Sequence, residues 1–158
     1  MIKRIFIPSC IASALILISA FSTPYPAFTA DSVTGIWLTE TGEGHVQIYK
    51  QGVNYYGKII WLKEPIDPGT GKPVTDKKNT DKVLQARPLL GLISLRNFKY
   101  AGNRLWENGR MYNHEDGKDY SCKIIMKDAN TLSVKIYNGI SQAVKVQTWF
   151  RVQEVAPN

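Results

Sequence analysis

The sequence predicts an all-β domain, a single antiparallel up-and-down β-barrel of roughly eight or nine strands. Short segments in which apolar and polar residues alternate follow one another at intervals of about 8–12 residues. Most connections between them are of hairpin length, so strands adjacent in the sequence are expected to be adjacent in the sheet. Closure into a barrel also removes the exposed sheet edges that promote aggregation.

Alternation defines the individual strands. The predicted strands cover residues 35–38, 45–49, 54–62, 89–95, 98–100, 105–113, 120–126, 132–136 and 143–153. In residues 45–49, for example, Val46 and Ile48 share one face. Residues 54–62 are apolar on both faces, so this strand is expected to be central or covered on both sides. Strict alternation places Trp61 on the same face as Tyr55 and Ile59.

One long polar loop interrupts the series of strands. Residues 63–81 are rich in lysine, aspartate, glycine and proline, and a loop longer than about 12–15 residues is usually either functional or disordered. Residues 80–87 are expected to form a helical turn or two, capped by Thr80 or Asp81 and ended by Pro88. We expect the loop to lie over one end of the barrel, where it would be a lid, a partner surface or a purely structural element.

The first 30 residues form a separate segment. A basic start, an apolar run over residues 5–21 and small residues after it are the three-part pattern of a secretory signal peptide. Cleavage is expected between residues 22 and 30, which leaves residues 31–158 as the single domain of a periplasmic or secreted protein. An uncleaved membrane anchor is the alternative, but the apolar run is short and prolines follow it. We therefore expect no stable membrane insertion after cleavage.

Charge and cysteine content exclude several classes of protein. The chain has 20 basic and 13 acidic side chains, and loss of Lys3 and Arg4 leaves 18 basic ones and a net charge of +5. The basic residues are scattered and interleaved with acids, which is typical of a solvated surface and argues against a nucleic-acid partner. Cys122 is the one cysteine after residue 30, so no internal disulfide is expected, and its place on an alternating strand favours a buried, inert thiol.

No catalytic or metal-binding motif stands out in the sequence. Oxygen ligands suited to calcium occur in and beside the long loop, at Asp67, Asp76, Asn79 and Asp81. Their spacing matches no known calcium loop, however, and five lysines between residues 63 and 82 oppose a cation. The histidines, His45 and His114, lie in no nucleophile or zinc motif. We therefore predict no cofactor, no metal and no enzymatic turnover.

Several motifs lie around the long loop and in later strands. They are residues 57–65 (GKIIWLKEP), 71–73 (GKP), 87–89 (RPL), 117–120 (GKDY) and 148–151 (TWFR). Together they resemble a family of exported bacterial proteins catalogued as domain of unknown function 2147, and the resemblance covers essentially all of residues 31–158. It implies a lipocalin-like, or calycin-like, barrel with a ligand cavity and no established activity.

The resemblance to lipocalins also implies how the two ends of the chain meet. In such barrels a Gly-x-Trp in the first strand is sealed by an arginine from the last strand, whose guanidinium packs over the indole and bonds nearby carbonyls. The matching residues here are Gly35, Trp37 and Arg151. We expect them to close one barrel end as a structural feature and not as a binding site.

We predict that the protein binds a small apolar or amphipathic molecule inside the barrel. The aromatic side chains expected to line the cavity are Trp61, Trp106, Tyr112 and Tyr120. Lys58 or Arg87 is expected to pair with an anionic head group such as a carboxylate. A barrel filled by its own side chains is the alternative. The protein would then be a periplasmic or surface interaction protein that presents residues 63–81 to another protein or to an envelope polymer.

Overall fold

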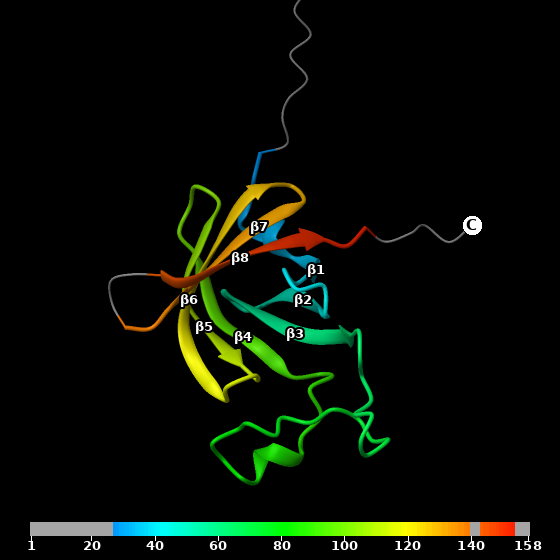
Figure 1. Ribbon diagram of the computed structural model, residues 1–158. Helices are drawn as coiled ribbons and strands as arrows, with labels where there is room; N and C mark the ends of the chain where they lie inside the picture. Colours follow the sequence, from blue (N-terminus) through cyan, green and yellow to red (C-terminus); the bar gives the residue numbers. More distant parts are fainter. Residues whose placement is uncertain (1–26, 140–142, 154–158) are drawn as a thin grey trace, which may run out of the picture.

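The structure, a computed structural model, describes residues 27–139 and 143–153. In this part of the chain, antiparallel strands close into a barrel in sequence order, and the last strand pairs with the first (Figure 1). The strands are β1 (Gly35–Leu38), β2 (Gly44–Gln51), β3 (Asn54–Leu62), β4 (Ile93–Tyr100), β5 (Leu105–Asn113), β6 (Lys118–Asp128), β7 (Thr131–Tyr137) and β8 (Ala143–Arg151). The predicted up-and-down barrel is confirmed.

One predicted strand, at residues 89–95, begins four residues too early. Residues 89–92 form a turn, and β4 starts at Ile93 and continues through the segment that was predicted as a separate strand at 98–100. Gly91 has a φ of +91°, a conformation that suits glycine, and its N–H donates to the Ile59 carbonyl at 2.7 Å. Leu89 and Leu92 are buried, so their apolar character reflects packing of a turn against the barrel and not a strand.

In residues 27–139 and 143–153, two short 3₁₀ helices accompany the barrel. The helical turn expected near residues 80–87 is the single turn η2 (Leu84–Ala86), and the Asp81 carboxylate accepts a hydrogen bond from the Val83 N–H at 2.9 Å. The sequence did not predict η1 (Ala30–Val33), which precedes β1. Within the described residues, no helix has the length and apolar character needed to cross a membrane.

Side chains fill one end of the barrel, which we call the closed end; it is formed by η1 and the β2–β3, β4–β5 and β6–β7 turns. Trp37 and Trp106 are fully buried there. Their indole N–H groups donate to backbone carbonyls of η1, from Trp37 to Val33 at 2.9 Å and from Trp106 to Ala30 at 3.0 Å. Because a buried donor without a partner costs free energy, these bonds make η1 an integral cover of this end.

Arg151 completes the closed end. Its guanidinium lies over the Trp37 ring, 4.1 Å from the ring centroid, and donates to the carbonyls of Thr34 and Ser32 at 2.8 Å each and of Ala129 at 2.7 Å. A Cβ on Gly35 would lie 2.4 Å from Arg151 Nη1, so glycine is needed at this position. First strand, last strand and η1 are therefore joined by one guanidinium.

Residues just before η1 and at its start also contact the barrel. Phe28 and Ala30 pack against the hydrophobic core, and the Arg104 guanidinium lies 4.0 Å from the centroid of the Phe28 ring. These residues belong to the stretch expected to be removed with the signal peptide. The rest of that predicted signal peptide, residues 1–26, lies outside the described residues.

Candidate functional site: a cavity at the open end of the barrel

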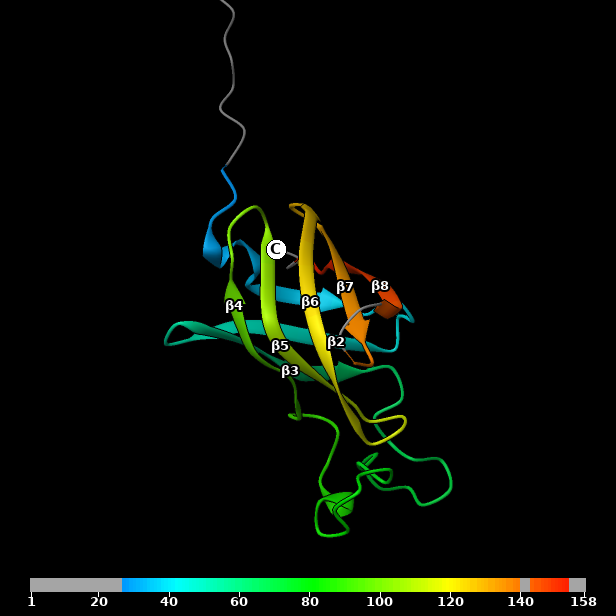
Figure 2. The same ribbon diagram turned by 90° about the vertical axis from the view of Figure 1, so that its left-hand side faces the viewer.

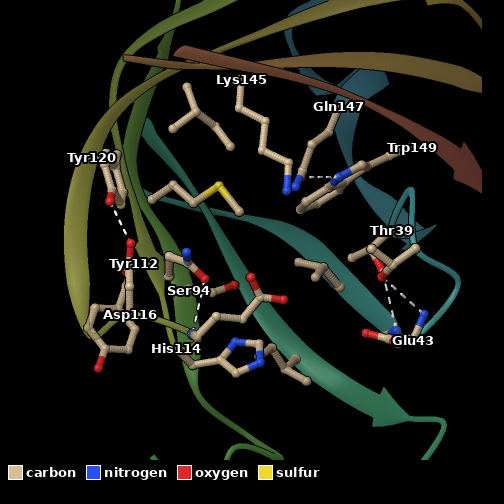
Figure 3. A pocket seen from close by; sticks show the side chains of 18 of the residues that line it. Thr39, Glu43, Ser94, Tyr112, His114, Asp116, Tyr120, Lys145, Gln147 and Trp149 are labelled. Carbon is tan, nitrogen blue, oxygen red and sulfur yellow. Dashed lines mark hydrogen bonds between the residues drawn. The ribbon is translucent and has the colours of Figure 1, made fainter. Parts of the chain in front are cut away.

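The opposite end of the barrel, which we call the open end, contains a cavity of about 310 Å³ (Figure 3). Its lining comes from the β1–β2 and β5–β6 turns and from the strand ends that lead to the β3–β4 and β7–β8 connections. The volume lies at the small end of the range of about 300–1,000 Å³ that is typical of ligand pockets. The interior of this barrel is thus filled at one end and hollow at the other.

The floor of the cavity is apolar. Its buried lining residues include Val46, Ile59, Ile136 and Trp149. The Trp149 indole N–H donates to the Gln147 side-chain oxygen at 2.9 Å, so its one polar group is already satisfied. Both side chains come from β8 and lie beside one another at the cavity (Figure 3). Such a floor favours an apolar group, because burial of apolar surface against it releases water.

The mouth of the cavity is polar and carries charge. The β5–β6 turn contributes His114, Glu115 and Asp116. The Tyr120 hydroxyl donates to Asp116 Oδ2 at 2.5 Å, and the Lys118 N–H donates to Asp116 Oδ1 at 3.1 Å. Desolvation acts to raise the pKa of Asp116, but these hydrogen bonds outweigh it and hold the pKa below its usual value. Asp116 is therefore a fixed negative charge at neutral pH.

Of the six predicted ligand-binding residues, Tyr112 and Tyr120 line the cavity. Trp106 fills the closed end instead. Lys58 pairs across the sheet with Gln47 and Ile93, on the face of β3 opposite the buried Ile59. Neither Lys58 nor Arg87 is among the residues that line the cavity, so neither is placed to pair with a head group inside it.

Trp61 points outward because of a β-bulge. Val46 pairs with Ile59, but the preceding residue of β2, His45, pairs with Trp61, so Ile60 is an extra residue on β3. A bulge of this kind reverses the side-chain alternation beyond it. Trp61 is consequently 41% exposed and stacks on the His45 imidazole with ring centroids 4.4 Å apart, while Leu62 takes the cavity-facing position.

Arg87 belongs to a buried polar network that anchors the long loop, which we call the loop anchor: Asp76, Asn79, Arg87 and Tyr112. The Arg87 Nε and Nη2 atoms donate to Asp76 Oδ2 at 3.0 and 2.8 Å. The Tyr112 hydroxyl donates to Asp76 at 2.8 Å, and the Asn79 side-chain amide bonds both Asp76 and the Tyr112 oxygen. Asp76 is fully buried, so the carboxylate is held by three side chains at once.

The loop between β3 and β4 folds on itself and extends beyond the ends of these strands (Figures 1 and 2). Isolated bridges pair Ile66 with Pro73 and Thr75 with Pro88. The Lys78 carbonyl packs closely against Gly117 of the β5–β6 turn, where a Cβ on residue 117 would lie 1.8 Å from the carbonyl oxygen. This contact fixes the loop to the turn. None of the described loop residues lines the cavity, which argues against a lid. A role in presenting residues 63–81 to a partner stays a prediction.

The Cys122 thiol and the side chains considered for calcium binding lie outside the cavity. Cys122 is buried, and desolvation raises the pKa of its thiol to about 12, so it is not a nucleophile at neutral pH. Asp76 and Asn79, considered above as calcium ligands, belong to the loop anchor. Among the described residues, no group of three or more His, Cys, Asp or Glu side chains is placed to hold a metal ion.

Sequence reasoning missed the cavity residues of β8, namely Lys145, Gln147 and Trp149. In this strand the more polar face points inward, whereas Val146 and Phe150 on the other face are each 51% exposed. A signal for this arrangement was present, because Arg151 shares its face with residues 145, 147 and 149 by the period of two. If Arg151 packs against the buried Trp37, those three residues follow it to the inside.

Comparisons with known proteins agree with this geometry. Residues 35–151 match the family described as uncharacterized protein conserved in bacteria, DUF2147. Among solved structures, the chain is similar to protein HP1028 from the human pathogen Helicobacter pylori, described as belonging to the lipocalin family, with a TM-score of 0.64 and 24% sequence identity. The match covers 77% of this chain and 83% of that chain, and it shows a shared fold. No curated protein matches the chain.

Proposed function

Since the chain belongs to the DUF2147 family and folds as a lipocalin-like barrel, we propose that it binds one small apolar or amphipathic molecule at the open end. The observation that carries this proposal is the cavity of about 310 Å³, with a buried apolar floor and a polar mouth. Ligand sites in proteins have this composition, since apolar walls supply affinity and a few polar groups orient the ligand.

The unequal packing of the two barrel ends supports a cavity that binds a ligand. Large side chains fill the closed end, including Trp37, Trp106 and Phe98. At the open end, the floor contains one large side chain, Trp149, while Val46, Ile59 and Ile136 are of moderate size and leave space that larger side chains would fill. Unfilled space in a core lowers stability by about 24 cal/mol per Å³. A ligand that occupies this space would recover part of that free energy.

We propose binding without turnover. Nucleophilic catalysis needs a nucleophile and a base within hydrogen-bond distance. His45 stacks on the outward Trp61, Cys122 is buried, and the His114 imidazole makes no hydrogen bond to a serine, threonine or cysteine of the described residues. The lining therefore supplies orienting groups, not an activated nucleophile.

The proposed binding site would act outside the cytoplasm. The support for export is the three-part pattern of residues 1–30. Fractionation of cells that produce the full chain is expected to place it in the periplasm or the medium, and a chain that starts at Thr23 is expected to stay in the cytoplasm. Equal distribution of the two chains would contradict export.

A neutral apolar probe tests the binding proposal. N-phenyl-1-naphthylamine, whose fluorescence rises in an apolar site, is expected to bind the purified protein with a stoichiometry of one. Val46→Trp, which places an indole on the cavity floor, is expected to abolish binding. Val53→Trp adds the same group to an exposed turn at the closed end and is expected to bind as the wild type does. Equal binding to both variants would contradict the proposal.

A further inference from the structure

We infer that the molecule bound in this cavity is a cationic amphiphile, with an apolar body on the floor and an amine at the mouth. The inference rests on the proposed binding function and adds the charge of the ligand. It replaces the expectation of an anionic head group, which depended on Lys58 and Arg87, because neither residue lines the cavity.

The mouth carries an excess of negative charge. Three carboxylates line it, those of Glu43, Glu115 and Asp116, against one ammonium group, that of Lys145. His114 is the remaining titratable group there apart from Tyr112 and Tyr120. The chain as a whole has a formal net charge of +7, so the sign at the mouth is opposite to that of the protein. Charge of one sign gathered around a cavity attracts a ligand of the opposite sign.

Most of these charged groups form no ion pair with another described residue. Glu43, Glu115 and Lys145 form no ion pair with any residue that the structure describes. The Glu115 and Glu43 carboxylates likewise accept no hydrogen bond in the described part of the chain, whereas Asp116 is held by Tyr120 and Lys118. Two carboxylates at the mouth are thus available to a ligand.

A hydroxyl that lines the cavity gives a second, independent indication of a polar ligand group. Ser94, at the start of β4, is 6% exposed and lines the cavity (Figure 3). Its hydroxyl makes no hydrogen bond to a described residue, and it is not one of the fully enclosed polar atoms that lack a partner, so it is accessible from the cavity. A hydroxyl accepts as well as donates hydrogen bonds. An ammonium group has three donors and no acceptor, so it could be shared between Ser94 and the carboxylates of the mouth.

The layout assigns the two parts of the ligand. Val46, Ile59 and Trp149 offer only apolar surface at the floor, because the Trp149 N–H is bonded to Gln147. A charged group placed there would lose its hydration without compensation. At the mouth Glu43, Glu115 and Asp116 are exposed, so each pair with an amine contributes little alone. Together, they are expected to favour an amine over a neutral group by about fivefold at low salt.

Three ligands of equal chain length test the inference: decylamine, decanol and decanoate, each used to displace N-phenyl-1-naphthylamine at pH 7.5 and low salt. Decylamine is expected to displace the probe at a concentration about fivefold lower than decanol, and decanoate is expected to be weakest. Higher ionic strength is expected to reduce the preference for the amine, because the carboxylates are accessible to salt.

Three charge-neutralising variants locate the effect. The double variant Glu43→Gln and Glu115→Gln is expected to reduce the preference for decylamine over decanol to within about twofold. The matched control is Glu64→Gln with Glu107→Gln, which changes the net charge equally but involves acids outside the cavity lining. The control is expected to keep the wild-type preference. Lys145→Gln is expected to act in the opposite direction and strengthen decylamine binding.

The outcomes separate this inference from the proposed function. If decanoate or decanol binds as tightly as decylamine, or if the preference survives in Glu43→Gln with Glu115→Gln, the inferred cationic head group is wrong while cavity binding stands. If no compound displaces the probe and Val46→Trp leaves probe binding unchanged, the binding function itself is wrong. Thermal unfolding of each variant shows that the comparison is made on folded protein.

Discussion

The closed and open ends of this barrel are formed by the same strands, β1 to β8, and differ in the segments that cover them. At the closed end, η1 lies across the barrel, Trp37 and Trp106 donate to its carbonyls, and Arg151 joins it to the last strand. At the open end, the β3–β4 loop is anchored to the outside of the cavity and contributes no lining residue among those described. The difference indicates that side-chain packing at the closed end stabilises the fold. The open end can therefore retain space for a ligand.

The largest effect is expected at the closed end, from Trp106→Ala. The side chain is fully buried, and truncation of such an aromatic costs about 3–5 kcal/mol of unfolding free energy. Trp61→Ala is the matched control, because Trp61 is 41% exposed and packs on the outward His45; we expect a loss below about 1 kcal/mol. Urea denaturation of both variants measures the difference, and equal losses would contradict the assignment of Trp106 to the packed interior and of Trp61 to the outer surface.

The next largest effect is expected from Asp76→Asn in the loop anchor. Burial acts to raise the pKa of Asp76, but hydrogen bonds from Asn79, Tyr112 and Arg87 outweigh it, so the pKa in the folded state is lowered. The charged carboxylate therefore stabilises the fold above the unfolded-state pKa of about 3.9, and this contribution is lost as the pH falls through the lower folded-state pKa. At pH 7 we expect Asp76→Asn to cost about 2–3 kcal/mol.

The pH dependence distinguishes this role from simple loss of packing. In the wild type, acidification below about pH 4 is expected to reduce the unfolding free energy more steeply than in Asp76→Asn, which lacks the titrating group. Asp119→Asn is the control, because Asp119 pairs with Arg96 at the surface and an exposed ion pair contributes about 0–1 kcal/mol. Parallel acid profiles for wild type and Asp76→Asn would contradict the role of this network.

The same substitution at two buried valines, one on the cavity floor and one in the packed core, sharpens the comparison further. Val134 and Val46 are both buried, but Val46 lines the cavity and Val134 does not. Val134→Phe is expected to cost about 1–3 kcal/mol of unfolding free energy, because extra volume in a filled core forces strain. Val46→Phe is expected to cost less than about 1 kcal/mol, since its ring has space to enter. Equal costs in chemical denaturation would show that the cavity floor is as tightly packed as the rest of the core.

Much of the architecture could be predicted from the sequence. Hairpin-length connections and alternating segments predict an up-and-down barrel, which the strand order confirms. These features are local, and each follows from a few neighbouring residues. The error at residues 89–92 arose because Leu89 and Leu92 are apolar for a reason that alternation does not reveal, namely burial of a turn against β3.

The cavity lining was harder to predict, because it depends on which face of a strand points inward. The extra residue Ile60 turns Trp61 outward, and no residue type marks such a bulge in advance. In β8, hydrophobicity favours the face that contains Val146 and Phe150, yet Gln147 and Trp149 are inside. Arg87 was assigned to a ligand because its true partner was not apparent. That partner, Asp76, lies eleven residues away in an irregular loop, where sequence spacing predicts no contact.

The smallest of these effects concerns where the mature chain begins. A protein that starts at Asp31 lacks the Ala30 carbonyl, so the buried Trp106 N–H loses its partner, and it lacks the Phe28 ring under Arg104. We expect it to be less stable than a protein that starts at Thr23, by about 1–2 kcal/mol of unfolding free energy in urea. If this difference is found, a cut near Ser22 would preserve the closed end, whereas a cut after Ala30 would remove part of its cover. Equal stability would show that η1 covers Trp106 without the preceding residues, and mass spectrometry of the exported chain identifies the cut directly.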